Sequence, residues 1–251
     1  MAGAFFGYLS YENIYNIEKV NNRRKINKLK TPELILFIPQ FLIIYDNLNK
    51  SIFISRHILN GKTDKEEYNS IIKKINEIEK NLKVINTKNI INLKKRIKLK
   101  IKSNTKKNKF LKNIKKAKEY IINGDIFQVV TSQRFEIDFK SNGSLLYRVL
   151  RKTNPSPFMY FFNLPKFQII GSSPEILVRL RSKKITVRPI AGTRPRGKNK
   201  NQDKMFELDL LSDRKELAEH LMLLDLGRND VGKVAEKSSV NVTAKFTIEK
   251  Y

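Results

Sequence analysis

The 251-residue sequence contains no cysteine. Disulfide bonds and thiolate metal sites are therefore excluded. A reducing compartment is compatible with this absence, and we predict a cytoplasmic protein. Long apolar runs are missing as well, since none reaches the roughly 20 residues that a transmembrane helix needs. The apolar start, Met1–Leu9, has no basic leader and is too short for a signal peptide, so we expect a strand there and no membrane association.

Acidic residues are scarce: 24 Asp and Glu stand against 51 Lys and Arg, giving a formal net charge of +27. Such an excess is typical of nucleic-acid-binding proteins, and a basic protein of that kind is the alternative from a different functional class. The lysines, however, are scattered among Asn and Ile, and the densest basic run, Lys94–Lys118, has almost no aromatic side chain to stack on bases. The composition therefore argues against nucleic acid as the main partner. A steep salt dependence of binding would support it.

Apolar runs, caps and turns predict an α+β chain. We expect strands at 34–39, 40–45, 51–55, 126–135, 158–162, 167–170, 176–180, 185–188 and 240–244. We expect helices from a Thr63–Asp64 cap to Ile78, over 110–121 with a stop at Asn123–Gly124, and over 145–150 behind a Ser144 cap. Short strands joined by tight turns favour antiparallel pairing. The predicted fold class is therefore α+β, with mainly antiparallel β-sheets and helices packed outside them.

Residues 83–109 show no clean period and are typical of a solvated linker. We therefore divide the chain into a β-rich region at 1–60, a helix with a basic linker at 61–105, and a larger domain at 106–251.

The segment Lys215–Asp230 carries the most informative pattern. Glu216 and Glu219 project together from one face of a predicted helix, where two like charges gain nothing unless a cation lies nearby. Mg²⁺ needs only one or two protein carboxylates, so the pair is a candidate metal site. The alternative is a solvated acidic turn on an ordinary amphipathic helix. Three leucines recur at helical spacing and are expected to face a core: Leu217, Leu221 and Leu224.

Four further motifs precede this helix in order: Gly124–Val130, Asn154–Met159, Gly171–Glu175 and Pro189–Gly197. Together the five segments resemble the chorismate-utilising enzymes, most closely anthranilate synthase component I. The resemblance implies the chorismate-binding enzyme fold, with 1–60 as the remainder of an N-terminal domain and 106–251 as the first portion of the catalytic domain.

The resemblance also implies a Mg²⁺-dependent lyase of tryptophan biosynthesis. In that reaction ammonia adds to C2 of chorismate as the 4-hydroxyl leaves, and elimination of pyruvate gives anthranilate. Mg²⁺ holds the ring carboxylate of the substrate, and a carboxylic acid protonates the leaving group. A separate glutaminase subunit is expected to supply the ammonia, because this chain has no cysteine to act as a glutaminase nucleophile.

Three carboxylates receive roles from the resemblance. Glu175 matches the general acid, and its apolar neighbours are expected to desolvate it partly; the alternative is an edge-strand glutamate that ends a turn. Glu219 matches a metal ligand, and Glu216 lies at a second metal-site position, binding directly or through water. His220, on the same helix, is typical of a structural histidine, and we keep it only as a neighbour of the ligands.

Gln128 and Ala191 distinguish this chain from its relatives. Isochorismate-forming relatives carry a water-activating lysine at the position of Gln128, and aminodeoxychorismate synthases carry a nucleophilic lysine at the position of Ala191. An amide and a methyl group cannot replace them. Unless both positions have simply drifted, they favour anthranilate synthase over aminodeoxychorismate synthase component I, the alternative within the family. Gly192 and Thr193 match the loop that approaches the substrate, where glycine permits close backbone contact; the alternative is an ordinary turn.

Tryptophan is a candidate effector. Six residues resemble the Pro-Ser-Pro part of the family's feedback site: Asn154, Pro155, Ser156, Pro157, Phe158 and Met159. The alternative is a rigid turn before a strand. The other half of that site, a leucine-rich segment with a Glu-Ser pair, is absent from the sequence, which argues against feedback inhibition.

Members of the family are considerably longer than this chain. Their later segments carry an active-site threonine, an arginine that grips a substrate carboxylate and further glutamate metal ligands. We therefore expect a partial record of a longer enzyme, or a decayed remnant, with half of a metal cage and no wild-type-like activity on its own.

Overall fold

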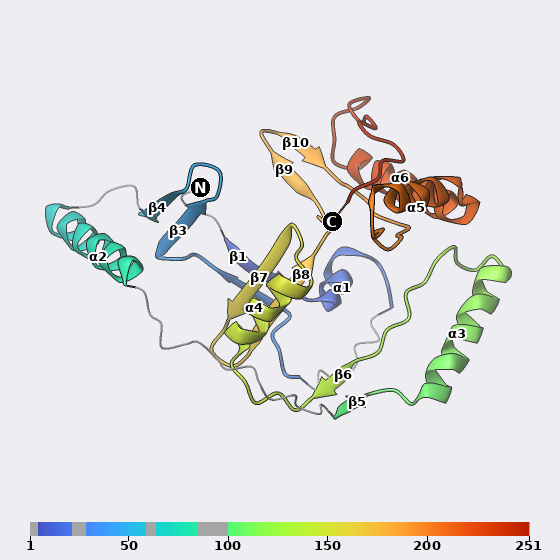
Figure 1. Ribbon diagram of the computed structural model, residues 1–251, viewed down its shortest axis with the longest axis horizontal. Coiled ribbons are helices and arrows are strands. Elements are labelled where there is room, and N and C mark those ends of the chain that lie inside the picture. The colour runs from blue at the N-terminus through green and yellow to red at the C-terminus, as the bar shows by residue number, and fades with distance from the viewer. Residues whose placement is uncertain (1–4, 22–28, 59–63, 85–99, 251) are drawn as a thin grey trace. The chain divides into compact units, whose positions relative to one another are not determined.

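The computed structural model describes residues 5–21, 29–58, 64–84 and 100–250. Three of the predicted features lie outside the described residues: the start of the first strand at 1–4, the Thr63 part of the first cap, and most of the linker, at 85–99. The chain divides into two compact units, Met1–Lys98 and Leu99–Tyr251, which run from blue to red in Figure 1.

The first unit contains β-hairpins and one long helix. Its elements are β1 (Phe6–Leu9), η1 (Tyr11–Asn13), α1 (Ile14–Ile17), β2 (Leu34–Phe37), β3 (Phe41–Asp46), β4 (Ser51–Arg56) and α2 (Lys65–Lys83). β1 pairs with β2 and β3 with β4, both antiparallel. The Asp46 carboxylate accepts hydrogen bonds from the backbone N–H groups of Leu48 and Asn49, which closes the β3–β4 turn. The strands predicted in this region are confirmed.

Helix α2 begins where the sequence predicts it. The Asp64 side chain accepts from the backbone N–H of Glu67 at 2.7 Å, which satisfies one of the unpaired donors of the first turn. Acidic Glu66 and Glu67 lie in the first turn and basic Lys80 and Lys83 in the last, as the helix dipole favours. These charges extend the helix five residues beyond the predicted Ile78, to Lys83.

The second unit carries the candidate site. Its elements are β5 (Ile101–Ser103), α3 (Lys107–Ile122), β6 (Phe135–Ile137), α4 (Gly143–Thr153), β7 (Phe158–Asn163), β8 (Gln168–Ser173), β9 (Arg179–Arg181), β10 (Lys184–Thr186), α5 (Lys200–Ser212) and α6 (Arg214–Gly232). β5 pairs with β6, β7 with β8 and β9 with β10. Every strand pair of the described residues is antiparallel, which confirms the predicted α+β class.

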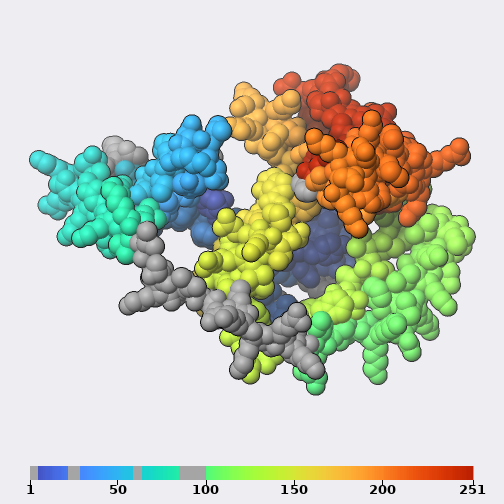
Figure 2. Space-filling model, in the orientation of Figure 1, coloured from blue at the N-terminus to red at the C-terminus, as the bar shows by residue number. Residues whose placement is uncertain are grey.

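Helix α4 packs on the β7–β8 hairpin, and in Figure 2 their atoms form one continuous yellow body. Gly143 is buried there. A Cβ at this position would collide with the side chain of Gln168 in β8, so glycine permits this close packing. Tyr147 of α4 stacks on Phe161 of β7 with ring centroids 5.9 Å apart. α5 and α6 likewise contact each other. In this unit α4 therefore packs on a hairpin, and α5 and α6 pack on each other, as expected of this class.

Two predicted strands are wrong. Residues 126–134 form no strand, and only Phe135 belongs to β6; residues 240–244 also lack strand structure. Phe127 and Val130 are 89% and 85% exposed, so neither face of this segment is covered. β-branched and aromatic residues favour a strand only where a neighbour and a covered face exist, and neither is present here.

Helix boundaries in the second unit follow local hydrogen bonding. α3 ends at Ile122, and Gly124 adopts a φ of 79° just beyond it, which confirms the predicted stop. The predicted Ser144 cap is wrong: the Asn142 side chain accepts from the Ser144 backbone N–H and starts α4 two residues earlier. Helix α5 was not predicted; it begins behind an Asn199 cap that accepts from the N–H of Gln202.

No apolar side chain within the described ranges is fully buried. Packing in both units is therefore partial, and local hydrogen bonds and ion pairs take a larger share in defining the elements. Among the helices that the structure describes, none has the length and apolar character needed to cross a bilayer.

Replacing Gly7 with Ala is expected to separate β1 from β2. Gly7 has a φ of 154°, and an added Cβ would collide with the backbone carbonyl of Ile35 on the paired strand. Backbone cannot yield as a flexible side chain does, so we expect a loss of about 1–3 kcal/mol in the free energy of opening this hairpin. Amide hydrogen exchange along both strands measures it. Unchanged exchange in Gly7→Ala would contradict the prediction, and Gly232→Ala, whose added Cβ meets no atom within 4 Å, is the control.

Candidate functional site

Helix α6 spans Arg214–Gly232 and contains the acidic pair, as the sequence predicts. It starts directly after α5, and the single residue between them, Asp213, is its N-cap. The Asp213 carboxylate accepts from the backbone N–H groups of Lys215 and Glu216 at 3.0 and 3.3 Å. These bonds, and first among them the one from Glu216, lower the pKa of Asp213, and Arg194 adds to the effect.

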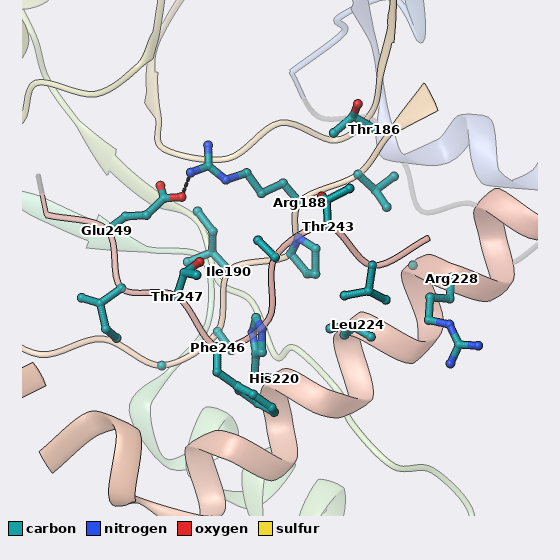
Figure 3. A pocket seen from close by; sticks show the side chains of 18 of the residues that line it. Thr186, Arg188, Ile190, His220, Leu224, Arg228, Thr243, Phe246, Thr247 and Glu249 are labelled. Carbon is teal, nitrogen blue, oxygen red and sulfur yellow. Dashed lines mark ion pairs between the residues drawn. The ribbon is translucent and has the colours of Figure 1, made fainter. Parts of the chain in front are cut away.

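The covered face of α6 is not quite the predicted one. Leu217, His220 and Leu224 line a pocket of about 1180 Å³, together with residues of the 186–196 and 240–250 segments. Figure 3 shows His220 beside Phe246, and their ring centroids are 5.2 Å apart. Leu221 is 49% exposed, so the expectation that it faces a core is wrong. The segment that covers α6 lies against the row through 217, 220 and 224, and His220 therefore takes the place expected for Leu221.

The 240–250 segment is held across this pocket by ion pairs. Arg188 pairs with Glu249, drawn as a dashed line in Figure 3, and Lys250 Nζ lies 3.0 Å from a Glu207 carboxylate oxygen on α5. These ion pairs hold the end of the segment, whereas residues 240–244 form no strand.

The Pro189–Thr193 loop lies between two of the predicted site residues. The backbone N–H of Ile190 donates to the Glu175 carboxylate at 3.1 Å. Two residues further on, a Cβ added to Gly192 would lie only 2.5 Å from Glu216 Oε2. The loop therefore touches the candidate acid on one side and a candidate metal ligand on the other. Ala191 and Thr193 belong to the same loop and line the pocket.

Gln128 joins the same group of residues from a distant part of the chain. Its Nε2 donates to Glu219 Oε1 over 3.4 Å, a long hydrogen bond. Two sets of contacts therefore reach α6: Glu175 and Gly192 share the loop that lies against Glu216, and Gln128 contacts Glu219.

Glu175 differs from its expected environment. Its backbone is fixed by Ser173, whose hydroxyl donates to the Glu175 carbonyl at 3.0 Å. The residue is exposed, however, so the partial burial expected from its apolar neighbours is wrong. Leu177 and Val178 in the following segment are also exposed, so apolar residues adjacent in sequence do not cover the carboxylate.

The Asn154–Met159 segment is tied to β8. The Ser156 and Ser172 hydroxyls lie 2.8 Å apart, and Ser156 also donates to the carbonyl of Ser173 at 3.0 Å. Ser172 Oγ donates to the carbonyl of Asn154 at 2.7 Å. These bonds fix the turn before β7, as the rigid-turn alternative would require.

Glu216 and Glu219 could together bind one Mg²⁺ that takes its remaining ligands from water and substrate, rather than an ion held by protein ligands alone. Residues three apart on a helix have Cβ atoms about 5–6 Å apart, within reach of one ion. Within the described ranges, no group of three or more His, Asp and Glu side chains is placed to hold a metal. Mg²⁺ takes one or two protein carboxylates and completes its shell with water and substrate oxygens, so this donor set suits it.

Arg194 is the residue that sequence reasoning missed. Its guanidinium contacts carboxylates on both α5 and α6: Asp209 at 2.5 Å, Asp213 at 2.9 Å and Glu216 at 3.7 Å. The hydrogen bonds that Arg194 donates to Asp209, and next to Asp213, raise the pKa of Arg194. One signal was present, because Arg194 follows directly on the Gly192–Thr193 motif and Asp213 precedes a predicted helix at a capping position.

A family model described as chorismate binding enzyme matches residues 1–251. Anthranilate synthase component 1 of Aquifex aeolicus is 44% identical over 250 residues, which cover 99% of this chain and 50% of that protein. Anthranilate synthase component 1 of Cereibacter sphaeroides is 65% identical over 138 residues, 55% of this chain and 28% of that protein.

A crystal structure of anthranilate synthase component I from Streptococcus pneumoniae matches with a TM-score of 0.87 at 33% identity, covering 100% of this chain and 54% of that one. The chain thus spans about half the length of the relatives that it matches end to end.

Acid should weaken the Arg196–Asp203 pair only at very low pH. The Arg196 hydrogen bond, followed by the Gly197 backbone N–H, lowers the pKa of Asp203 from 3.8 to about 2. A depressed folded-state pKa means that the stabilisation is complete above the unfolded value of 3.8 and is lost as the pH falls through about 2. A carbon-detected NMR titration of Asp203 should give that midpoint, and Arg196→Gln should move it upward. A wild-type midpoint near 3.8 would refute the prediction.

Proposed function

The chain belongs to the chorismate-binding enzyme family, and we propose that it supplies part of the active site of an anthranilate synthase component I, converting chorismate and ammonia to anthranilate and pyruvate. One observation carries the proposal. The Pro189–Thr193 loop is hydrogen-bonded to Glu175 and lies against Glu216, so the candidate acid and a candidate metal ligand flank one segment of backbone.

Glu216 and Glu219 would hold Mg²⁺, which when bound neutralises and positions a substrate carboxylate. Asp213 orients the first turn of α6 and thereby Glu216, and Gln128 donates to Glu219 from outside the helix. An uncharged amide at Gln128 cannot deprotonate water, which favours ammonia as the nucleophile.

Glu175 would donate a proton to the departing 4-hydroxyl group. The N–H of Ile190 fixes its carboxylate toward the loop, and Gly192 lets that loop come close without a side chain in the way. Since Glu175 is exposed, the bound substrate has to exclude water from it. The methyl group of Ala191 offers no nucleophile, which is consistent with direct addition of ammonia rather than a covalent intermediate.

Two partners belong to the proposal. A glutaminase subunit would deliver ammonia, since this chain has no cysteine of its own for that reaction. Tryptophan would act as an effector only if Asn154–Met159 can bind it, and the hydrogen bonds of Ser156 to β8 occupy part of that segment.

A chimera tests the function directly. Residues 1–251 replace the aligned half of the Aquifex aeolicus protein, and anthranilate fluorescence is followed with chorismate, ammonium and Mg²⁺. We expect anthranilate formation, and Glu175→Gln should lower kcat by about 10²- to 10⁴-fold because the amide cannot donate the proton. Gly232→Ala should retain activity. A folded chimera without activity, aminodeoxychorismate as the product, or full kcat in Glu175→Gln would each contradict the proposal.

Gly192→Ala in the same chimera should raise its requirement for Mg²⁺. The new methyl group would lie 2.5 Å from Glu216 Oε2 and 2.9 Å from Leu210 Cδ1, so the glutamate has to turn away. Displacing a metal ligand's support typically weakens metal binding 10- to 100-fold, and we expect a half-saturating Mg²⁺ concentration at least about ten times higher. Gly232→Ala adds the same group in open space and should leave the Mg²⁺ dependence unchanged. Equal Mg²⁺ dependence in the two variants would argue against Glu216 as a ligand.

A further inference from the structure

Arg194 makes a different contact through each nitrogen of its guanidinium. Nε lies 2.5 Å from Asp209 of α5, Nη2 2.9 Å from the Asp213 cap, and Nη1 3.7 Å from Glu216 Oε1. Nη1 also donates to the backbone carbonyl of Thr193 at 3.2 Å, which holds the side chain close to its own loop. One cation therefore connects the end of the substrate loop with α5 and α6.

These contacts are more than a solvated surface pair. The side chains of Arg194, Glu216 and Asp213 are 23%, 20% and 34% exposed, whereas pairs that contribute little are typically solvent-exposed. Of the three partners only Asp209, at 61%, is exposed. Three carboxylates gather around one guanidinium in a chain with only 24 acidic residues. Without Arg194 their charges would repel, and the α5–α6 junction would lose its common partner.

The two oxygens of Glu216 face different neighbours. Oε1 is directed to Arg194 Nη1, and Oε2 lies against Gly192. At 3.7 Å the arginine attracts the carboxylate without the short contact of a direct hydrogen bond, which leaves lone pairs for another cation. The attraction of Arg194 therefore favours the orientation of the Glu216 carboxylate in which Oε1 faces the guanidinium.

We propose that Arg194 is a positioning residue that holds Glu216 and the Ala191–Thr193 loop in register for Mg²⁺; this rests on the proposed function. Its planar fork reaches three carboxylates in fixed directions. A lysine keeps the charge but presents a single nitrogen, so it cannot satisfy Asp209, Asp213 and Glu216 together.

The test compares Arg194→Lys with Arg196→Lys. Hydrogen exchange is measured in the 251-residue chain, and Mg²⁺ binding in the chimera with the Aquifex aeolicus protein. Arg196 pairs with Asp203 through the same kind of fork. Amide hydrogen exchange at Gly192 and Glu216 reports positioning without any metal, and Mg²⁺ titration of the Glu216 carboxyl carbon by NMR reports the site. We expect Arg194→Lys to speed exchange at both amides at least about five-fold and to raise the Mg²⁺ Kd about ten-fold. Arg196→Lys should change neither.

The outcomes separate this proposal from the proposed function. Unchanged exchange and Mg²⁺ Kd in Arg194→Lys would overturn the positioning role. If Glu216 of the wild type does not respond to Mg²⁺, the metal site fails, while faster exchange in Arg194→Lys would still support the positioning role. Should Arg194→Lys not fold, Asp209→Asn removes one anchor and keeps the arginine; it is expected to give the same changes at smaller amplitude, and unaltered exchange in it would overturn the proposal.

Discussion

The carboxylate of Asp213 serves two partners at once. Its Oδ1 accepts the first backbone donors of α6, and its Oδ2 binds Arg194. Asp213 thereby connects the first turn of the helix, where Glu216 lies, with the end of the loop at Thr193. The first turn of α6, which carries Glu216, therefore depends on this shared cap.

Several of the few acidic residues of this chain are concentrated near the candidate site. Bases exceed acids by more than two to one, yet several of the acids gather around Arg194, Arg196 and the first turns of α5 and α6. No apolar side chain of the described part is fully buried, so the hydrophobic effect alone does not define this region. Hydrogen bonds to caps and arginine–carboxylate pairs supply the directionality that a tight core would otherwise give.

Local signals accounted for most of the elements. Asp64 and the turn at Asp46 fix their neighbours through hydrogen bonds within three residues, and such short-range chemistry can be read from sequence. The Asn199–Gln202 pair carried the same kind of signal for α5 and was overlooked. The strands expected at 126–135 and 240–244 failed for another reason: strand formation needs a neighbour, and adjacent residues do not reveal whether one is present.

In the candidate site too, local features could be predicted from the sequence and features that depend on distant segments could not. The pair at Glu216 and Glu219 follows from helical periodicity, whereas the exposure of Glu175 and the exchange of Leu221 for His220 on the covered face depend on which distant segment lies nearby. The sequence places Arg194 next to the Gly192–Thr193 motif, but its role follows from tertiary contacts, because its carboxylate partners are 15 to 22 residues away.

The close approach of Gly192 to Glu216 also limits how such a protein can change over time. Backbone from one segment and a carboxylate from another share a surface with no room for a methyl group. A crossover between related genes that falls between the loop and α6 would join surfaces shaped in different lineages. We therefore expect selection against such crossovers, which favours joint inheritance of the two segments.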